Sequence, residues 1–363
     1  MPVRAVLRAV IATATVVLLA SLAACGGSAP SSKQGGSRFI SSARCAQNQA
    51  AGTVTYLTGY HYQASASILE VLAAEKLGYY GDLCLTVKVQ PGNGVTSQAG
   101  QLLASGRVQL AGIAEQDLIQ LRLAGSDIEG ISSYSNSGLD IVMTEPSVTN
   151  LKQINGETLG YKGYMPLALE AMLDKEGVDF ASLKKVTVGY DPTVLPRGQV
   201  QALTGFISNE PLLLKADGDK VRIWDPATYG IASSLGSYAV NPAFAQAHPT
   251  AVEDFLRATF HAFQYCSQTA HVDQCISIEH GYAGPTDDAA HEKQVWLTES
   301  GVAAKAPVPT GFGTVDMKNV AQLAPMVTQY AKTPVSASQA QSYFTNKYVD
   351  AISKDGRIVW PAR

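Results

Sequence analysis

The sequence predicts an α/β fold built as two similar lobes. Short β-rich runs alternate with helical stretches from Thr53 onward, which is typical of a mostly parallel sheet covered on both faces. The alternation restarts after Met143, and "SGRVQLAGIAEQDL" from Ser105 is similar to "RGQVQALTGFISNEPL" from Arg197. Each copy predicts a helix end, a glycine turn, a strand, and a polar loop that opens another helix. We therefore expect two related lobes and not a long repeat array.

The first half of this pattern supplies four strands and three helices. In the first helix, Ile68, Leu69, Leu72 and Leu77 recur at helical spacing on one face, and Gly78 is a suitable C-cap. We expect strands at Val54–Leu57, Leu85–Val89, Val108–Ile113 and Ile128–Tyr134, and helices at Ala64–Leu77, Val95–Ala104 and Gln116–Leu123.

The second half supplies five strands, and the remainder of the chain is mainly helical. Strands are expected at Thr158–Tyr161, Val186–Tyr190, Ala202–Phe206, Val221–Trp224 and Ser237–Val240, with helices at Leu167–Glu176 and Pro211–Ala216. After Pro242 we expect helices at Ala251–Tyr265, Ala289–Ser300, Val315–Ala331 and Ala337–Ile352.

The N-terminus has the pattern of an export signal. Arg4 and Arg8 precede an apolar stretch, Ala9 to Leu22, that is shorter than a membrane span of roughly 20 residues. The following Leu22-Ala23-Ala24-Cys25 resembles the lipobox of bacterial lipoproteins, which implies cleavage before Cys25 and lipidation of its thiol. Residues 1–24 are then a signal peptide, and 25–49, rich in Gly and Ser, a lipid anchor and flexible linker. The alternative is a plain secretory signal in which Cys25 is incidental.

Four further cysteines predict two disulfides. An exported body faces an oxidising compartment, where paired cysteines persist. Four cysteines allow three pairings, of which we favour Cys45–Cys84, joining the start of the body to the first lobe, and Cys266–Cys275, closing a short loop.

Composition excludes some classes of protein. The 363 residues suffice for two domains, and 46% hydrophobic with 16% charged residues is typical of a globular chain. A net charge of −3 argues against nucleic-acid binding, which needs a basic surface.

Four motifs in a fixed order resemble the substrate-binding proteins of ABC importers. They are "ASASILEVLAAEKLGYYG", "LTVKVQPGNG", "ASGRVQLAGIAE" and "VQALTGFISNEP". The resemblance is to the group whose relatives deliver thiamine-type pyrimidine precursors, riboflavin, nitrate, taurine and other sulfonates. It implies a periplasmic-binding-protein-like fold of type II, with two α/β lobes, a two-strand hinge and a ligand cleft between them.

The resemblance also implies how the chain is divided. Lobe 1 would cover 50–142, lobe 2 would cover 143–235, and 236–363 would return to lobe 1, with crossings near 139–145 and 229–240. The protein would be a monomer, lipid-anchored to the extracytoplasmic face of the cell membrane, with an ABC permease and its ATPase subunits as partners. Hinge motion would close the cleft.

Loops at the carboxyl ends of the strands supply the candidate ligand-binding residues, because ligands of open α/β sheets bind there. They are Tyr60, His61, Tyr62, Asn93, Glu115, Tyr134, Tyr161, Tyr164, Asp191, Asn209 and Glu210. Each also has a purely structural interpretation: the aromatic residues as caps of the core, and Asn93 as part of a plain turn. Glu115 and Glu210 would be first-turn carboxylates favoured by the helix dipole.

These loops favour an aromatic heterocycle over a small oxyanion as the ligand. A nitrate or sulfonate usually needs fixed positive charge, and the loops contain only Lys162, with Arg197 at a distance. A planar nitrogen heterocycle suits ring stacking and carboxylate acceptors. We predict a thiamine pyrimidine precursor or a riboflavin-like vitamin. The alternative is nitrate, taurine or another sulfonate.

An enzymatic function is not expected. A pyrimidine-biosynthesis enzyme on the same scaffold is the alternative of another class, but relatives of that type carry a cysteine-rich iron motif that this sequence lacks. No Gly-x-Ser-x-Gly, P-loop or His-Glu-x-x-His motif occurs. Zinc-type donors recur at His261, Cys266, His271, Cys275 and His280, yet their spacing is unusual for zinc and a disulfide is favoured. No catalytic residue, cofactor or metal is predicted.

Overall fold

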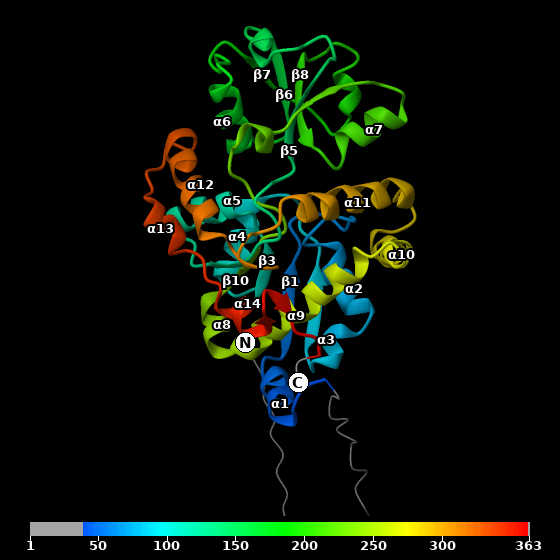
Figure 1. Ribbon diagram of the computed structural model, residues 1–363, viewed down its shortest axis with the longest axis vertical. Coiled ribbons are helices and arrows are strands. Elements are labelled where there is room, and N and C mark those ends of the chain that lie inside the picture. Colours follow the sequence, from blue (N-terminus) through cyan, green and yellow to red (C-terminus); the bar gives the residue numbers. More distant parts are fainter. Residues whose placement is uncertain (1–38, 362–363) are drawn as a thin grey trace, which may run out of the picture. The chain divides into compact units, whose positions relative to one another are not determined.

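The computed structural model describes residues 39–361, which contain two five-stranded sheets, each the centre of one lobe (Figure 1). Lobe 1 combines the first part of this range with its last third, and lobe 2 is the segment between. The first pass through lobe 1 contains α1 (Ser42–Gln49), β1 (Thr53–Leu57), α2 (Leu69–Lys76), α3 (Tyr79–Asp82), β2 (Thr86–Gln90), α4 (Thr96–Ala104), β3 (Leu110–Gly112), α5 (Glu115–Leu123) and β4 (Glu129–Ser132).

Lobe 2 follows, and the chain then returns to lobe 1. Lobe 2 contains β5 (Asp140–Thr144), η1 (Leu151–Ile154), β6 (Thr158–Tyr161), α6 (Leu167–Lys175), β7 (Lys184–Thr187), η2 (Pro192–Val194), β8 (Ala202–Phe206), α7 (Glu210–Ala216), β9 (Arg222–Trp224) and η3 (Pro226–Tyr229). The return contains β10 (Tyr238–Val240), α8 (Pro242–Ala247), α9 (Pro249–Cys266), α10 (Val272–Ala283), α11 (Ala289–Lys305), α12 (Met317–Tyr330), α13 (Ala337–Gln341), α14 (Lys347–Ile352), β11 (Ser353–Lys354) and β12 (Arg357–Ile358).

The two sheets have the same topology. Their strand orders are β2-β1-β3-β10-β4 and β7-β6-β8-β5-β9. In each, the first three strands are parallel and the fourth is antiparallel to both of its neighbours. That antiparallel strand, β5 or β10, is the first strand after the chain changes lobe. The predicted α/β fold with two lobes is therefore confirmed.

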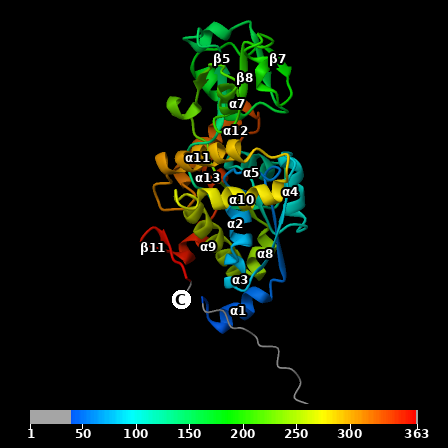
Figure 2. The ribbon, with the colours of Figure 1, turned by 90° about the vertical axis from the view of Figure 1, so that its right-hand side faces the viewer.

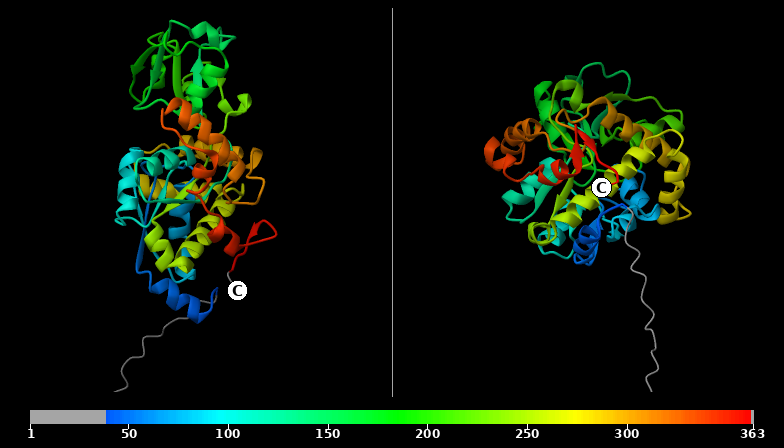
Figure 3. Two further views of the ribbon diagram at one scale, coloured as in Figure 1. Left: turned by 90° about the vertical axis from the view of Figure 1, so that its left-hand side faces the viewer. Right: turned by 60° about the horizontal axis from the view of Figure 1, so that its bottom comes forward.

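The helices of the last third cover lobe 1, as Figures 2 and 3 show for the yellow-to-red segment. Successive strand residues point to opposite faces of a sheet. Tyr56 of β1 therefore packs in one core with Phe255 of α9, while the next residue, Leu57, packs in a second core with Leu323 of α12. Both faces are thus buried, as expected for a mostly parallel sheet.

Two antiparallel segments join the lobes as a hinge. Tyr134 N donates to Leu235 O at 2.8 Å, and Leu235 N donates to Ser135 O at 3.1 Å. Gly138 N donates to Ser233 Oγ at 2.6 Å. Residues 133–139 and 231–237 thus cross side by side and are joined to each other by hydrogen bonds.

Helix α2 begins five residues later than the sequence predicts. Buried carboxylates of α11 take the backbone donors that would open it: Ala64 N donates to Glu292 at 2.5 Å and Ala66 N donates to Glu299 at 2.7 Å. Ser67 has φ 65°, which breaks helical geometry. A tertiary contact therefore overrides the local helix preference of residues 64–68.

Helices α3, α8 and α10 were not predicted, and two predicted elements have a different position or extent. The strand expected at Val186–Tyr190 is β7, Lys184–Thr187, an edge strand with all four side chains exposed. Because none of these side chains is buried, the sequence has no alternation of buried and exposed residues that would locate the ends of the strand. The helix expected over Ala337–Ile352 is divided into α13 and α14. The break lets Thr345 N donate to Gly130 O at 2.9 Å and Tyr343 O accept from Gly130 N at 3.0 Å, beside β4.

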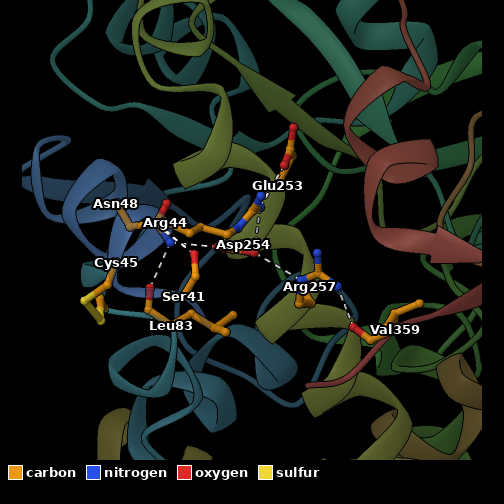
Figure 4. A network of polar contacts seen from close by, with 10 residues as sticks. Ser41, Arg44, Cys45, Asn48, Leu83, Glu253, Asp254, Arg257 and Val359 are labelled. Carbon is orange, nitrogen blue, oxygen red and sulfur yellow. Dashed lines mark hydrogen bonds and ion pairs between the residues drawn. A yellow bond between two sulfur atoms is a disulfide. The ribbon is translucent and has the colours of Figure 1, made fainter. Parts of the chain in front are cut away.

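Helix α1 lies within the segment expected to be a linker, so the folded body starts before residue 50. Arg44 donates to Asp254 through Nε at 2.7 Å and to Glu253 at 2.7 Å, and Asn48 Nδ2 donates to the same Asp254 at 2.7 Å (Figure 4). Arg257 donates to Asp254 from the other side at 3.1 Å. The network joins α1 to α9.

Both favoured disulfides are present, Cys45–Cys84 and Cys266–Cys275. Because Cys266 and Cys275 are bonded to each other, their sulfur atoms are not available as zinc ligands. The signal segment and Cys25 lie outside the described residues. Within residues 39–361, no helix is long and apolar enough to cross a membrane.

Candidate functional site

Two adjoining cavities lie at the strand-end loops, the larger between the two lobes and the smaller within lobe 2. The larger, about 470 Å³, is lined by the start of α4, by α5, and by residues 163–167 of lobe 2. The smaller, about 60 Å³, is lined by Asp140, Lys162 and Glu210 among others. Tyr164 and Pro166 line both cavities. The space lies where ligands of α/β sheets bind and has the size of a small-molecule pocket.

Polar contacts outside the hinge also join the two lobes. His291 Nε2 of α11 donates to Asn209 Oδ1 at 2.9 Å, and Ser208 Oγ donates to Glu299 Oε1 of α11 at 2.8 Å. At the other side, Tyr330 of α12 donates to Asp174 of α6 at 2.8 Å. The lobes therefore also touch through α11 and α12 of lobe 1.

The one lysine that lines the smaller cavity is already paired. Lys162 forms an ion pair with Glu210, whose side chain is 2% exposed. Glu210 Oε2 also accepts from Phe206 N at 2.7 Å. Among the described residues that line these two cavities, no other lysine or arginine occurs. The described residues that line these two cavities thus include no unpaired lysine or arginine.

Two carboxyl groups without a cationic partner also line the cavities. Burial raises the pKa of Asp117, on α5, to about 6. Burial and the neighbouring Asp117 and Glu210 raise the pKa of Asp140, at the start of β5, to about 7. The proximity of these acids makes the cleft an environment that favours hydrogen-bond donors or positive charge.

One tyrosine lies close to these acids, and two others lie close to the Lys162–Glu210 pair. Tyr164 is 54% exposed, and Asp117, burial and Asp140 raise the pKa of its hydroxyl. Tyr60 of lobe 1 lies close to Tyr190 of lobe 2: burial and the hydrogen bond with Tyr190 raise the pKa of Tyr60 to about 12. Lys162 Nζ lies 5.6 Å from the centroid of the Tyr190 ring. Rings from both lobes therefore face the space between them.

Other predicted site residues are occupied inside lobe 1. Tyr134 is 2% exposed, and its ring packs 4.3 Å from that of Phe263 in the aromatic core. Tyr62 donates to Val89 O at 3.2 Å and its ring contacts Tyr282. Neither lines the two cavities.

Glu115 is fully buried beside the hinge, where it accepts from Asn319 Nδ2 at 3.2 Å while its backbone N–H donates to Ser234 Oγ at 3.1 Å. Burial raises the pKa of Glu115 to about 8, so this carboxyl is mainly protonated at neutral pH. It lies outside both cavities.

The remaining candidates, Asn93, Asp191, His61 and Tyr161, line neither of the two cavities. Asn93 accepts from Val95 N at 3.0 Å within its turn, and Asp191 accepts from Thr193 N at 2.9 Å. These bonds from Thr193 lower the pKa of Asp191. His61 is exposed and Tyr161 is half-buried. The glycine turn is sterically required, because a Cβ on Gly92 would lie 2.1 Å from Thr58 O.

Sequence reasoning missed Asp117, Asp140 and Tyr190. Asp117 lies two residues beyond the predicted Glu115, one step into the helix, and Asp140 lies in the stretch predicted as a crossing. Tyr190 directly precedes the predicted Asp191. Comparing the two repeated motifs would have extended the list of candidate residues into the helix that follows each motif, and so to Asp117. Nothing in the sequence around Asp140 pointed to a binding role.

A family model described as "NMT1/THI5 like" matches residues 65–270, more than half of the chain. The chain belongs to the NMT1/THI5-like family. The match covers all of lobe 2 and the strand-end loops of lobe 1 from Ser65 on. No curated protein matches the chain.

Several solved structures share the fold of this family member. A sulfonate-binding protein of a putative sulfonate ABC transporter from Methylobacillus flagellatus has a TM-score of 0.61 at 12% identity, covering 82% of this chain and 92% of its own. The nitrate-binding protein NrtA from Synechocystis has 0.60 at 11%, covering 82% and 87%. The aliphatic sulphonate-binding protein SsuA from Escherichia coli has 0.58 at 14%, covering 81% and 92%. At these identities the likeness establishes the fold.

Proposed function

We propose that this chain is the solute-binding protein of an ABC importer and that it captures a small ligand between its lobes. The family match and the common fold support this proposal, as do the names of the solved structures, which describe periplasmic binding proteins, one of them of a putative ABC transporter. The observation that carries it is the larger cavity between the strand-end loops of the two lobes, which the smaller cavity of lobe 2 adjoins.

The chemistry of the cleft supports a nitrogen heterocycle that donates hydrogen bonds or carries positive charge. Asp117 and Asp140 would accept from amino groups, and Tyr60, Tyr164 and Tyr190 would stack on a flat ring. A thiamine pyrimidine precursor fits these requirements, and a riboflavin-like ring is the next choice. The paired state of Lys162 removes the cation that an oxyanion would use.

Nitrate, taurine or another sulfonate is the second candidate. The solved structures of the same fold bear sulfonate and nitrate in their names, and the first turns of α4 and α6 line the larger cavity. Backbone N–H groups at helix N-termini bind oxyanions. An anion would then have to lie at these helix ends, away from Asp117 and Asp140.

Thermal melting separates the two ligand classes. A ligand that binds the native state raises the melting temperature by mass action. We expect thiamine or its aminopyrimidine precursor to raise it, and Asp117→Asn to reduce the rise. A rise with taurine or nitrate alone would establish the second candidate. Turnover of the pyrimidine by the purified protein would instead indicate a biosynthetic enzyme.

Membrane attachment is a further part of the proposal. Lipidated Cys25 would hold the protein on the extracytoplasmic face, beside the permease and its ATPase. Cys25→Ser is expected to release the protein from the membrane fraction, and continued retention of this variant would refute the anchor.

A further inference from the structure

Three carboxylates converge at the corner between α10 and α11, on the lobe 1 side. Glu279 comes from α10, Asp287 from the connecting loop, and Glu292 from the first turn of α11. One oxygen of each lies within 4.8 Å of the others. Like charges so close repel each other unless something neutralises them.

Glu279 lacks any partner for its charge. Its side chain is 0% exposed, and neither of its carboxylate oxygens has a hydrogen-bond partner. Leaving a buried polar group unpaired is costly, so a native protein normally provides it with a partner. The unpaired oxygens belong to the same cluster as Asp287 and Glu292.

The neighbours of the cluster do not supply that partner. Asp287 Oδ2 lies 3.2 Å from His280 Nδ1, and Glu292 Oε2 accepts from Ala64 N at 2.5 Å. No lysine or arginine of residues 39–361 forms an ion pair with any of the three carboxylates. Burial and the two neighbouring carboxylates raise the pKa of Glu279 to about 8.

We propose that Glu279, Asp287 and Glu292 bind a divalent cation, with Ca²⁺ as the best match. Ca²⁺ prefers carboxylate and carbonyl oxygens at about 2.3–2.6 Å, so two of its ligands lie at most about 5 Å apart. The 4.8 Å limit of this cluster satisfies that condition. Mg²⁺, with bonds of about 2.0–2.1 Å, would require a tighter cluster. Zinc prefers nitrogen and sulfur donors, whereas the three groups of this cluster offer only carboxylate oxygens.

The cation would fix the part of lobe 1 that meets lobe 2. Glu292 holds Ala64, in the segment after Tyr60, and the same helix carries His291 and Glu299, which contact lobe 2. Binding would therefore join α10, α11 and the β1–α2 segment at one point. The role is structural and is independent of which ligand enters the cleft.

A proton shared between Glu279 and Asp287 is the competing way to neutralise the cluster. It would satisfy the buried oxygens without any metal ion. The two explanations differ in their response to added Ca²⁺.

The test is calcium binding to the mature chain after treatment with EDTA. We expect equilibrium dialysis to give about one Ca²⁺ per chain with a Kd of about 10⁻⁴–10⁻³ M, as in extracellular modules. At 10 mM CaCl₂ the melting temperature should rise by at least about 2 °C. The same concentration of MgCl₂ should give a smaller rise.

Variants make the test specific. Glu279→Gln keeps the side-chain shape and removes a repelling charge, so it should fold but lose both the stoichiometric binding and the calcium-dependent rise. Asp287→Asn, nearer the surface, should weaken binding at least 10-fold. Glu157→Gln removes an exposed carboxylate elsewhere and should behave as the unmodified chain. Absence of stoichiometric binding to the unmodified chain, or an unchanged response in Glu279→Gln, would overturn the proposal.

Discussion

The two lobes share one local pair of hydrogen bonds, formed between a glutamine and a threonine of a neighbouring strand. In lobe 1, Gln109 N donates to Thr55 O at 2.9 Å, and Gln109 Oε1 accepts from Thr55 N at 2.9 Å. In lobe 2, Gln201 N donates to Thr158 O at 2.9 Å, and Gln201 Oε1 accepts from Thr158 N at 3.2 Å. Each glutamine thus forms two hydrogen bonds with one threonine of the neighbouring parallel strand, Thr55 of β1 or Thr158 of β6.

The lobes differ at the other end of the same strands. The helix after β3 begins with Glu115 and the helix after β8 begins with Glu210, both nearly fully buried. Glu210 is paired with Lys162, whereas Glu115 has Asn319 as its side-chain donor and its pKa is raised to about 8. The scaffold is repeated, but one lobe neutralises its buried acid with a cation and the other with a proton.

The largest expected change in stability comes from altering how each buried acid is neutralised. Lys162→Met leaves Glu210 buried without its cation and should lower the free energy of unfolding by about 3 kcal/mol. Glu115→Gln replaces a largely protonated carboxyl by a neutral amide that needs no proton uptake on folding, so at pH 7 it should not lower the free energy of unfolding. Urea unfolding of both variants at pH 7 measures the difference. Equal losses would show that the two acids are neutralised alike.

The second prediction separates cleft tyrosines from core tyrosines. Tyr164→Ala should weaken binding of the heterocycle about 10-fold, with the free energy of unfolding changed by less than about 1 kcal/mol, because this ring is more than half exposed. Tyr62→Ala should leave affinity within about threefold and lose about 1–2 kcal/mol of stability, because its ring packs on Tyr282. Calorimetric titration and urea unfolding check both. The opposite pattern would place Tyr62 in the site.

The third prediction concerns pH. The pKa of Glu115 is about 8 in the folded chain and about 4.5 when unfolded, so the folded state binds the extra proton between these values. Stability therefore falls as pH rises from about 5 to 8. Glu115→Gln should make this fall shallower, by at most about 1.4 kcal/mol per pH unit. An identical slope in the variant would mean that the carboxyl ionises normally.

The smallest effect tests the repeated pair of hydrogen bonds itself. Gln109→Ala and Gln201→Ala each remove the acceptor of one strand N–H, and each should cost about 1 kcal/mol. The two losses should agree within about 0.5 kcal/mol if the lobes are equivalent at this point. Unequal losses of free energy in urea unfolding would show that the two lobes share the geometry of this contact but not its contribution to stability.

The sequence predicted those parts of the fold whose cause is local or periodic. The strands at Thr158–Tyr161 and Ala202–Phe206 have the predicted bounds because they are short apolar runs bordered by turns. The repeated motif placed β3 and β8 at the same position of the two sheets. The start of α2 was not predictable, because it depends on Glu292 and Glu299, more than 200 residues away.

The sequence identified some of the residues that line the cavities and missed others. Tyr164, Glu210 and Lys162 were recognisable as residues of strand-end loops, and all three line the cavities. Tyr134 was also chosen on that ground, yet it is buried in the core, since alternate residues of an extended segment face opposite ways. Asp140 became visible only when the structure brought it near Asp117.

The most direct test of the account is the melting temperature of the purified chain with single solutes. An acidic cleft with a neutralised lysine should bind the aminopyrimidine precursor of thiamine, or another donor-rich heterocycle, and the melting temperature should rise by several degrees near saturation. Asp117→Asn should reduce this rise, and taurine and nitrate should have no effect. A rise with taurine or nitrate and none with any heterocycle would contradict the account.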